Sequence, residues 1–299
     1  MKSKIIIVGS NGQDGIILKN KLNKLDYNIV EITKNNFDIS NKNSVLNLVK
    51  KNKPKKIFYL ASYHHSSDSK IKKNKNFFEL TNQINYTSPH YFLDAILNYN
   101  RSCKFFYASS SMIYDHSNKL INESSVPRPD NDYGYSKLYG MQLCKYYRKN
   151  KKLFVSTGIL FNHTSSHSKD YFITKKIIKT IVLIYKNKTK KLIIGNINAE
   201  LDLGSAYDYV DAMIKILNLK KCDDFIISSG KKIFLRQFIN EAFKYLKIDY
   251  KKYVFENSAK IIRKNKKRIG DSSFLYEKTG WKPKLTLKEI VKEMIDREL

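Results

Sequence analysis

The chain has 299 residues, 42% of them apolar, so it can bury a full core without help from disulfides or structural metals. Its three cysteines, Cys103, Cys144 and Cys222, are far apart and outside any C-x-x-C pair, which argues against a disulfide framework and a zinc site. The formal net charge of +29 is spread along the chain, a pattern typical of solvated faces that attract anionic small molecules rather than of a nucleic-acid surface.

The N-terminal segment Met1–Lys4 leads directly into the short apolar run Ile5–Val8, which is too short for a signal-peptide core. Lysines interrupt every apolar stretch well before the roughly 18 residues that a membrane span needs. With the unpaired cysteines, these features predict a cytoplasmic protein in a reducing compartment, without a membrane segment or a metal.

The first half of the chain alternates short apolar runs with longer amphipathic stretches. The expected strands are Lys4–Val8, Asn28–Thr33, Lys56–Leu60, Lys104–Ala108 and Phe154–Leu160, with Asp224–Ser228 as a late return strand. The expected helices are Gly12–Leu25, Ser44–Lys50, Phe77–Tyr99 and Tyr135–Lys149. A repeated order of strand then helix is typical of a parallel sheet with helices on both faces. The sequence therefore predicts an α/β fold with a Rossmann-type, doubly wound parallel sheet.

Beyond Phe161 the pattern becomes irregular. Helical periodicity recurs at Phe172–Lys186, Asp208–Leu217, Leu235–Leu246 and Leu287–Asp296. We expect a smaller substrate-binding lobe that is interleaved with the last elements of the sheet. The predicted division is a dinucleotide-binding domain over residues 1–160 and a lobe over residues 161–299.

A glycine-rich turn, G-x-x-G-x-x-G, directly follows the first expected strand and opens the first expected helix. Glycines let the backbone approach a pyrophosphate closely, and the helix N-terminus offers unbonded N–H groups and a partial positive charge. This context predicts a dinucleotide site. Its candidate contacts in the turn are Gly9, Asn11, Gly12, Gln13, Asp14 and Gly15. Further candidates are Asp38, Leu60 and Ala61.

The end of the second strand bears on the choice of cofactor. Sites that prefer NAD place a carboxylate there to accept from the ribose 2′-hydroxyl. Here the strand runs into Thr33 and Lys34, and Glu31 lies inside the strand rather than at its tip. Donors and positive charge suit a 2′-phosphate, so Thr33 and Lys34 predict NADP(H), with NAD as the open alternative.

A candidate catalytic group follows the fourth expected strand. Ser110 lies in the serine cluster after Ala108, and Tyr133 precedes Lys137 by four residues at the start of a helix. Residues four apart share a helix face, and a nearby ammonium favours the phenolate. Tyr133 would exchange a proton with a sugar hydroxyl while a hydride moves to or from the cofactor, and Ser110 would bond the same oxygen. Tyr133 and Lys137 are also expected to contact the cofactor.

With these motifs in place, the chain resembles the extended short-chain dehydrogenase/reductases, and within them the GDP-mannose 4,6-dehydratase family over nearly its full length. The segments that carry the resemblance are Gly12–Gly15, Tyr133–Lys137, Gly158–His163, Phe172–Ile177, Ile194–Asn196, Asp208–Val210 and Gly280–Pro283. The resemblance implies a Rossmann domain with a small sugar-nucleotide lobe, a nucleotide-sugar substrate, and a homodimer or homotetramer. It assigns catalysis to Ser110, Tyr133 and Lys137. The implied substrate contacts are Ser111, Met112, Asn162, Thr174, Lys175 and Arg236.

The chain departs from that family at three places. The family pattern has a Glu where Met112 stands, an Arg where Leu201 stands, and an Arg-Pro-x-Glu segment where residues 263–266 stand. The missing Glu resembles the base that removes the C5 proton during dehydration, and a thioether cannot take a proton. His64 or His65, in the loop after the third strand, is a candidate substitute proton carrier, with His65 assigned to the catalytic group.

Three interpretations follow from these departures. The first is a 4-keto-sugar reductase or epimerase that kept the dehydratase scaffold. The second is a true 4,6-dehydratase with a substitute base such as His65. The third is a non-catalytic NADP-binding or nucleic-acid-binding protein, which the intact Ser-Tyr-Lys group disfavours.

Overall fold

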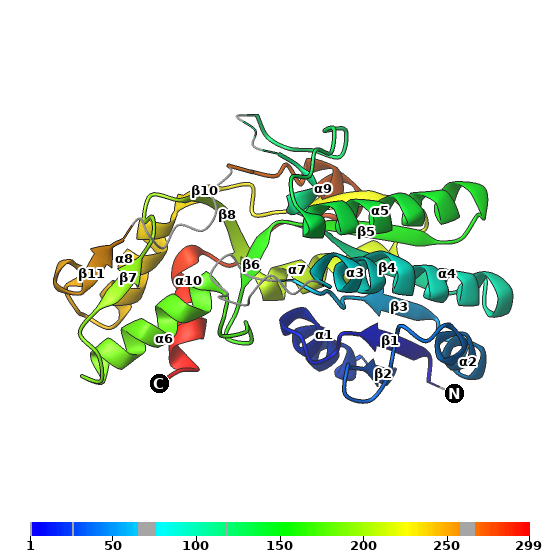
Figure 1. The fold of residues 1–299 in the computed structure, drawn as a ribbon, viewed down its shortest axis with the longest axis horizontal. Coiled ribbons are helices and arrows are strands. Elements are labelled where there is room, and N and C mark those ends of the chain that lie inside the picture. Colours follow the sequence, from blue (N-terminus) through cyan, green and yellow to red (C-terminus); the bar gives the residue numbers. More distant parts are fainter. Residues whose placement is uncertain (1, 26, 65–75, 116, 118, 258–266) are drawn as a thin grey trace.

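The computed structural model describes the chain except for residues 1, 26, 65–75, 116, 118 and 258–266. Its main sheet has the order β2-β1-β3-β4-β5-β9, and every neighbouring pair in it is parallel. The strands are β1 (Lys4–Val8), β2 (Asn28–Ile32), β3 (Lys56–Tyr59), β4 (Lys104–Ser110), β5 (Val155–Leu160) and β9 (Asp224–Ile227). The predicted parallel, doubly wound sheet is therefore confirmed (Figure 1).

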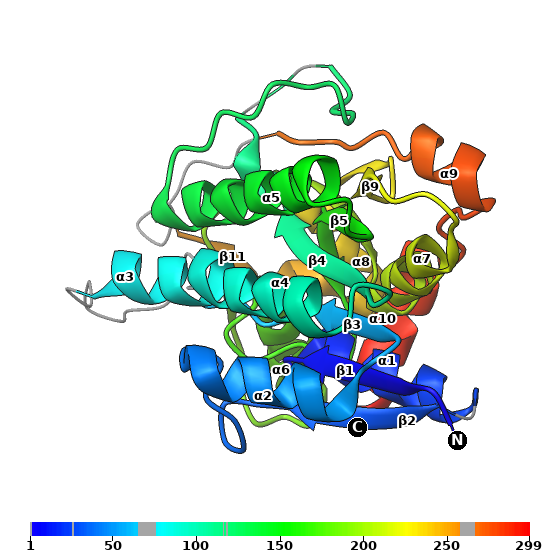
Figure 2. The same ribbon diagram turned by 90° about the vertical axis from the view of Figure 1, so that its right-hand side faces the viewer.

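Helices cover both faces of this sheet, as Figure 2 shows. Side chains alternate along β1, so that Ile5 and Ile7 pack on one face while Ile6 and Val8 pack on the other. The first face is covered by α1 (Gln13–Asn23) and α7 (Ala206–Asn218). The second face is covered by α2 (Lys42–Asn52), α4 (Ser88–Tyr99) and α5 (Asp132–Asn150). Burial on both faces explains why the strands read as continuous apolar runs.

The helix expected over Phe77–Tyr99 is divided into three segments. These are α3 (Phe77–Asn82), a π-helical turn η1 (Gln83–Thr87) and α4. Pro89 lies in the first turn of α4 and has no N–H to donate to the Asn85 carbonyl four residues before it. The Asn85 carbonyl accepts instead from the Tyr107 hydroxyl on β4, at 2.6 Å. The wide turn thus ties this helix to the sheet.

A second cluster of elements forms the lobe, at the left of Figure 1. It contains a three-stranded sheet in the order β10-β8-β6 and a β11-β7 pair. The strands are β6 (Asn162–Thr164), β7 (Leu192–Ile194), β8 (Glu200–Ser205), β10 (Lys232–Phe234) and β11 (Val254–Glu256). They pack with α6 (Ile173–Tyr185), α8 (Leu235–Tyr245) and α10 (Leu287–Asp296) around a separate apolar core.

The chain passes between the two parts more than once. After entering the lobe at β6 it returns to the main sheet as α7 and β9, and later as α9 (Ser273–Thr279), which packs on β9. The predicted interleaving of the lobe with the last core elements is therefore confirmed. The division at residue 160 stays a prediction.

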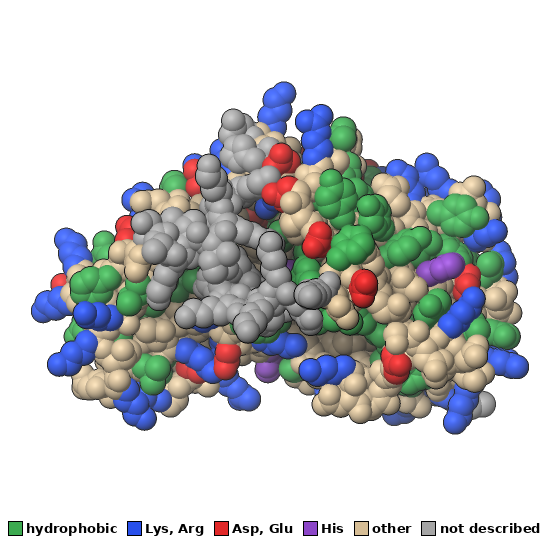
Figure 3. Space-filling model, in the orientation of Figure 1, with side chains coloured by type: hydrophobic (Ala, Val, Ile, Leu, Met, Phe, Trp, Pro, Cys, Tyr) green, Lys and Arg blue, Asp and Glu red, His purple; other side chains and the backbone are tan. Residues whose placement is uncertain are grey.

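Two surface properties bear on the expected partners. Within the described residues, no helix combines the length and the apolar character needed to cross a membrane. Lysine and arginine side chains are scattered over the face shown in Figure 3 rather than gathered into one patch.

Candidate active site

The glycine turn lies where the order of the main sheet reverses. The chain leaves β1 for β2 on one side and β3 for β4 on the other, so these two connections diverge at the carboxyl ends of β1 and β3, where open α/β sheets have their ligand-binding crevice. Gly9 has φ +91°, and a Cβ there would lie 2.8 Å from the Ala61 nitrogen. A Cβ on Gly15 would lie 2.3 Å from the Gly9 carbonyl oxygen. Only glycine fits at both positions, because the turn packs closely against Ala61 and against its own backbone.

The N-terminus of α1 opens into this crevice. Gly12 is its N-cap residue and supplies no side-chain cap, which leaves the first N–H groups of the helix available for an anion. Asn11 is exposed beside it, Leu60 donates its N–H to the Val8 carbonyl at 2.9 Å, and Ala61 lies next to Gly9. The arrangement fits a dinucleotide pyrophosphate, although each residue's contact with a cofactor stays a prediction.

Two other members of the turn bond to the lobe. The Gln13 side-chain oxygen accepts from the hydroxyls of Ser165, at 3.0 Å, and Ser168. The Asp14 carboxylate lies 3.0 Å from Nε2 of His163. Burial alone would lower the pKa of His163, but the Asp14 charge and the hydrogen bonds that the imidazole makes to Asp14 and to the Phe161 carbonyl raise it. These two side chains therefore connect the glycine turn to β6 and to the segment that follows it.

The segment after β2 contains the candidates for the ribose end of the cofactor. The Thr33 N–H donates to the side-chain oxygen of Asn36 at 2.8 Å, and Lys34 is exposed. Asp38 accepts from the hydroxyl and the N–H of Ser40, which lower the pKa of its carboxyl. Glu31, inside β2, pairs with Lys19 at 3.2 Å.

Ser110, Tyr133 and Lys137 come together at the end of β4 and the start of α5. Lys137 is 1% exposed, its Nζ donates to the Ala108 carbonyl oxygen at 2.8 Å, and it lies 5.9 Å from the centre of the Tyr133 ring. Burial lowers the pKa of Lys137 to about 7. Burial also raises the pKa of Tyr133, and hydrogen bonds from Ser62 and Ser110 partly offset that rise. A protonated phenol next to a serine hydroxyl and an amine is an arrangement that can deliver a proton to a carbonyl oxygen.

Two residues that the sequence analysis did not single out support this group. The Ser62 hydroxyl lies 3.5 Å from the Tyr133 hydroxyl and donates to the Asn85 side-chain oxygen at 3.1 Å. The Asn85 amide in turn donates to Ser136 at 3.0 Å. Asn85 is fully buried in the π-helical turn. A buried asparagine in a helix that a proline interrupts is the signal by which it could have been found.

Around the trio, the remaining candidates occupy different environments. His64 packs its ring edge-on against Tyr133, with 4.5 Å between the ring centres. Met112 follows Ser110 by two residues, and its N–H donates to the Ser110 hydroxyl at 3.2 Å. Ser111 is buried. His65 and residues 263–266 lie outside the described residues.

The lobe candidates are mostly engaged in internal contacts. Thr174 shares a 2.8 Å hydrogen bond with Thr164, and Lys175 donates to the Ser166 carbonyl at 2.6 Å and pairs with Glu298. Both are buried, so packing accounts for them, and their role in substrate binding stays a prediction. Asn162 and Arg236 are exposed, with the Arg236 guanidinium over the Phe234 ring.

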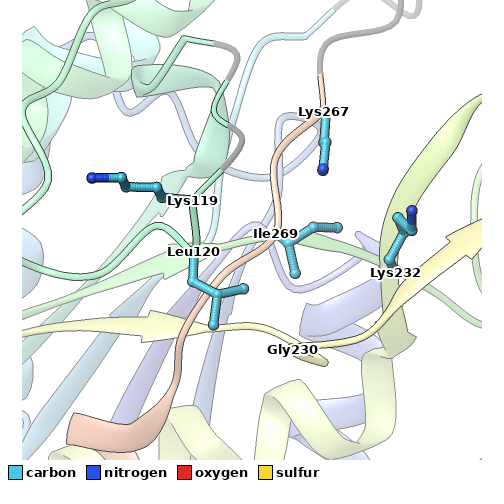
Figure 4. A pocket seen from close by; sticks show the side chains of 6 residues that line it. All are labelled: Lys119, Leu120, Gly230, Lys232, Lys267 and Ile269. Atoms are coloured by element: carbon cyan, nitrogen blue, oxygen red, sulfur yellow. The ribbon is translucent and has the colours of Figure 1, made fainter.

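A small pocket of about 250 Å³ lies between the loop after β4 and the lobe. Its cations are Lys119, Lys232 and Lys267, of which Lys232 and Lys267 point toward each other while Lys119 points away (Figure 4). The Glu200 carboxylate lies 3.7 Å from Lys232 and 4.0 Å from Lys267. The positive charge of the pocket is therefore partly balanced.

The comparisons with known proteins give the class of this fold, a nucleotide-sugar-modifying enzyme of the extended short-chain dehydrogenase/reductase type. The family model for GDP-mannose 4,6 dehydratase matches residues 31–294. The chain therefore belongs to the GDP-mannose 4,6-dehydratase family.

Two individual relatives share 30% and 28% sequence identity with this chain. GDP-mannose 4,6 dehydratase 1 of Arabidopsis thaliana is 30% identical over 271 residues, 88% of this chain and 73% of its own. GDP-mannose 4,6 dehydratase 2 of Caenorhabditis elegans is 28% identical over 282 residues, 88% of this chain and 72% of its own.

Solved structures share the fold over nearly the whole chain. RMD from Pseudomonas aeruginosa, complexed with NADPH, has a TM-score of 0.86 at 21% identity and covers 99% of each chain. The UDP-Glc/GlcNAc 4-epimerase from Campylobacter jejuni has a TM-score of 0.80 at 20% identity and also covers 99% of each chain.

Proposed function

We propose that this chain is an NADP(H)-dependent enzyme that reduces or epimerises a 4-keto sugar nucleotide. The observation that carries the proposal is the assembled Ser110, Tyr133 and Lys137 group with Met112 two residues after the serine. The group supplies what carbonyl reduction needs from the protein, a proton donor and a hydrogen bond to the same oxygen. Met112 supplies no base for the elimination of water.

In the proposed mechanism, the C4 oxygen of the sugar lies against Tyr133 and Ser110. The bound cofactor supplies the hydride to C4. Tyr133 donates its proton to the C4 oxygen, Ser110 holds that oxygen in place, and the protonated form of the buried Lys137 stabilises the phenolate that Tyr133 becomes. The glycine turn and the N-terminus of α1 would hold the cofactor.

The experiment for this function uses a panel of 4-keto-6-deoxy sugars carried on GDP, UDP, CDP or dTDP. NADPH oxidation with one nucleotide is expected, with stabilisation of the folded protein by the same compound in a thermal-shift assay. Absence of both effects across the panel would overturn the proposal.

A second candidate function is GDP-mannose 4,6-dehydration with a substitute base. The names of the curated relatives favour it, and so does the imidazole of His64 beside Tyr133. It differs from the first in requiring loss of water from GDP-mannose.

The cofactor preference is proposed from the end of β2. Thr33 and Lys34 offer donors and charge, whereas Glu31 is paired with Lys19. We expect NADP(H) to bind at least several-fold more tightly than NAD(H), as measured by fluorescence titration of both cofactors. Equal or reversed affinity would contradict this expectation.

The proposed assembly is a homodimer or homotetramer in the cytoplasm. An exposed aromatic strip on α3, η1 and α5 supports self-association, because large exposed apolar patches mark interaction sites. Its members are Phe78, Tyr86, Tyr135, Tyr139 and Tyr146.

A further inference from the structure

His64 lies in a segment that two contacts fix beside the glycine turn. The Leu60 N–H donates to the Val8 carbonyl at 2.9 Å, and Ala61 packs against Gly9. Ser62, next in the segment, reaches both Asn85 and Tyr133. The chain after β3 therefore enters the catalytic group directly, and His64 follows two residues later.

The imidazole of His64 bridges the two parts of the molecule. One side meets the Tyr133 ring edge-on, with 4.5 Å between ring centres. The other side stacks on Phe172 at 6.0 Å and an angle of 14° between the ring planes. Phe172 is the N-cap residue of the lobe helix α6. The imidazole is thus held by packing between the proposed proton donor and the lobe, and it is only partly buried.

We propose that His64 is a general base that removes the proton from C3, next to the C4 carbonyl of a bound 4-keto sugar nucleotide, and not the C5 proton that loss of water requires. This inference deepens the proposed function and rests on it. It assigns to the chain an enolisation step that reduction alone does not need. It also places the base on the loop after β3 instead of at position 112.

The step balances without any oxidant or reductant. An imidazole nitrogen takes the proton from C3, and the electrons of the broken C–H bond form a double bond to C4. The electrons of the C4 carbonyl move to its oxygen, which Tyr133 protonates. The enol then returns its O–H proton to Tyr133 while the carbon takes a proton, so that the C4 carbonyl forms again. Protonation on the same face restores the ketone with a hydrogen from solvent, and protonation on the opposite face gives the epimer. Imidazole, with an ordinary pKa of about 6.5, is suited to take this proton near neutral pH.

Hydrogen exchange tests this step separately from reduction. The protein is incubated in D₂O with NADP⁺ and GDP-4-keto-6-deoxymannose, and deuterium at C3 and C5 is followed by mass spectrometry and NMR against an enzyme-free control. Deuterium uptake at C3 by the wild-type protein is expected. His64→Phe keeps a ring between Tyr133 and Phe172 but has no base. Its rate of deuterium exchange should therefore fall by about 10²-fold or more relative to the wild type.

Two further variants complete the experiment. His64→Gln also removes the imidazole base but replaces it with a polar side chain. Thermal stabilisation by NADPH reports whether each variant is folded. His90→Gln, which changes an α4 histidine paired with Asp94 at 3.6 Å, should exchange at the wild-type rate.

The outcomes separate the inference from the function. If the wild type oxidises NADPH with a 4-keto sugar but exchanges no hydrogen at C3, or if either folded His64 variant exchanges at the wild-type rate, the role of His64 is wrong and the reductase function stands. If the wild type does neither with any member of the nucleotide panel, the proposed function fails as well.

Discussion

The two sides of the crevice hold their polar side chains in different ways. On the sheet side, Nζ of Lys137 donates to the Ala108 carbonyl, and the Tyr133 hydroxyl lies 3.5 Å from the Ser62 hydroxyl. On the lobe side, Thr174 and Lys175 bond to Thr164 and to the Ser166 carbonyl inside the lobe. The sheet side thus presents a prearranged chemical group, whereas these lobe side chains serve the fold of the lobe itself.

This difference distinguishes the residues that we propose for catalysis from the residues that hold the lobe in place. A group held by backbone carbonyls and neighbouring helices keeps its geometry before a ligand arrives, which is what catalysis requires. The lobe is connected to the sheet side through the glycine turn, by Asp14 with His163 and by Gln13 with Ser165. Substitutions on the sheet side should therefore alter turnover, and substitutions at the connection should alter stability.

The largest effect is expected for Tyr133→Phe. The ring that packs against His64 is kept and the proton donor is lost, so turnover should fall by about 10²–10⁴-fold while NADPH affinity stays nearly unchanged. Steady-state kinetics and cofactor titration measure the two quantities. Tyr135→Phe, an exposed position on the same helix, is the matched control and should retain the wild-type rate. Wild-type turnover in Tyr133→Phe would show that the chemistry lies elsewhere.

Next in size is the pH dependence of stability at Lys137. Because burial lowers its pKa to about 7, the unfolded chain binds a proton that the folded state releases between about pH 7 and 10, and folding becomes more favourable as pH rises through that window. Lys137→Met removes the titrating amine and with it this contribution to the pH dependence of stability. The free energy of unfolding of the variant relative to wild type should fall by about 2–3 kcal/mol between pH 7 and 9.5, as measured by urea unfolding. Parallel profiles for the two proteins would contradict a buried, neutralised lysine.

A smaller effect is expected at the connection between the parts. The pKa of His163 is raised by Asp14, so the pair contributes stability that is complete below the unfolded histidine pKa and is lost as pH rises through the folded one. Asp14→Asn should cost about 1–2 kcal/mol near pH 6 and less near pH 9. Glu31→Gln removes the exposed pair with Lys19 and should cost less than about 1 kcal/mol at either pH. A cost for Asp14→Asn that is equal at both pH values would show that the pair carries no charge.

Sequence patterns predicted the sheet side well because its signals are local. The strand Lys4–Val8 matches β1 to the residue, since it is a short, buried apolar run before a glycine turn. The helix Leu287–Asp296 matches α10, whose start is marked by a capping box of Thr286 and Glu289. Ser110, Tyr133 and Lys137 were found because they lie at a strand end and four residues apart on one helix.

The remaining features depend on contacts between distant residues. The strands β6, β7, β10 and β11 have three residues each, too few for a period to be read, and they are stabilised by pairing with partners far along the chain. Gln13 and Asp14 were predicted as cofactor contacts from their place in the turn. No local pattern shows that these side chains meet Ser165 and His163, about 150 residues later.

Met112 permits the most direct test of the central claim, that the chain keeps the catalytic trio but does not eliminate water. The protein is incubated with GDP-mannose and NADP⁺, and loss of water is followed by mass spectrometry, beside a parallel assay with NADPH and GDP-4-keto-6-deoxymannose. We predict consumption of NADPH in the second assay and no appreciable loss of water in the first, with Met112→Glu gaining water loss because it restores a base. Rapid loss of water from GDP-mannose by the wild-type protein would contradict the account.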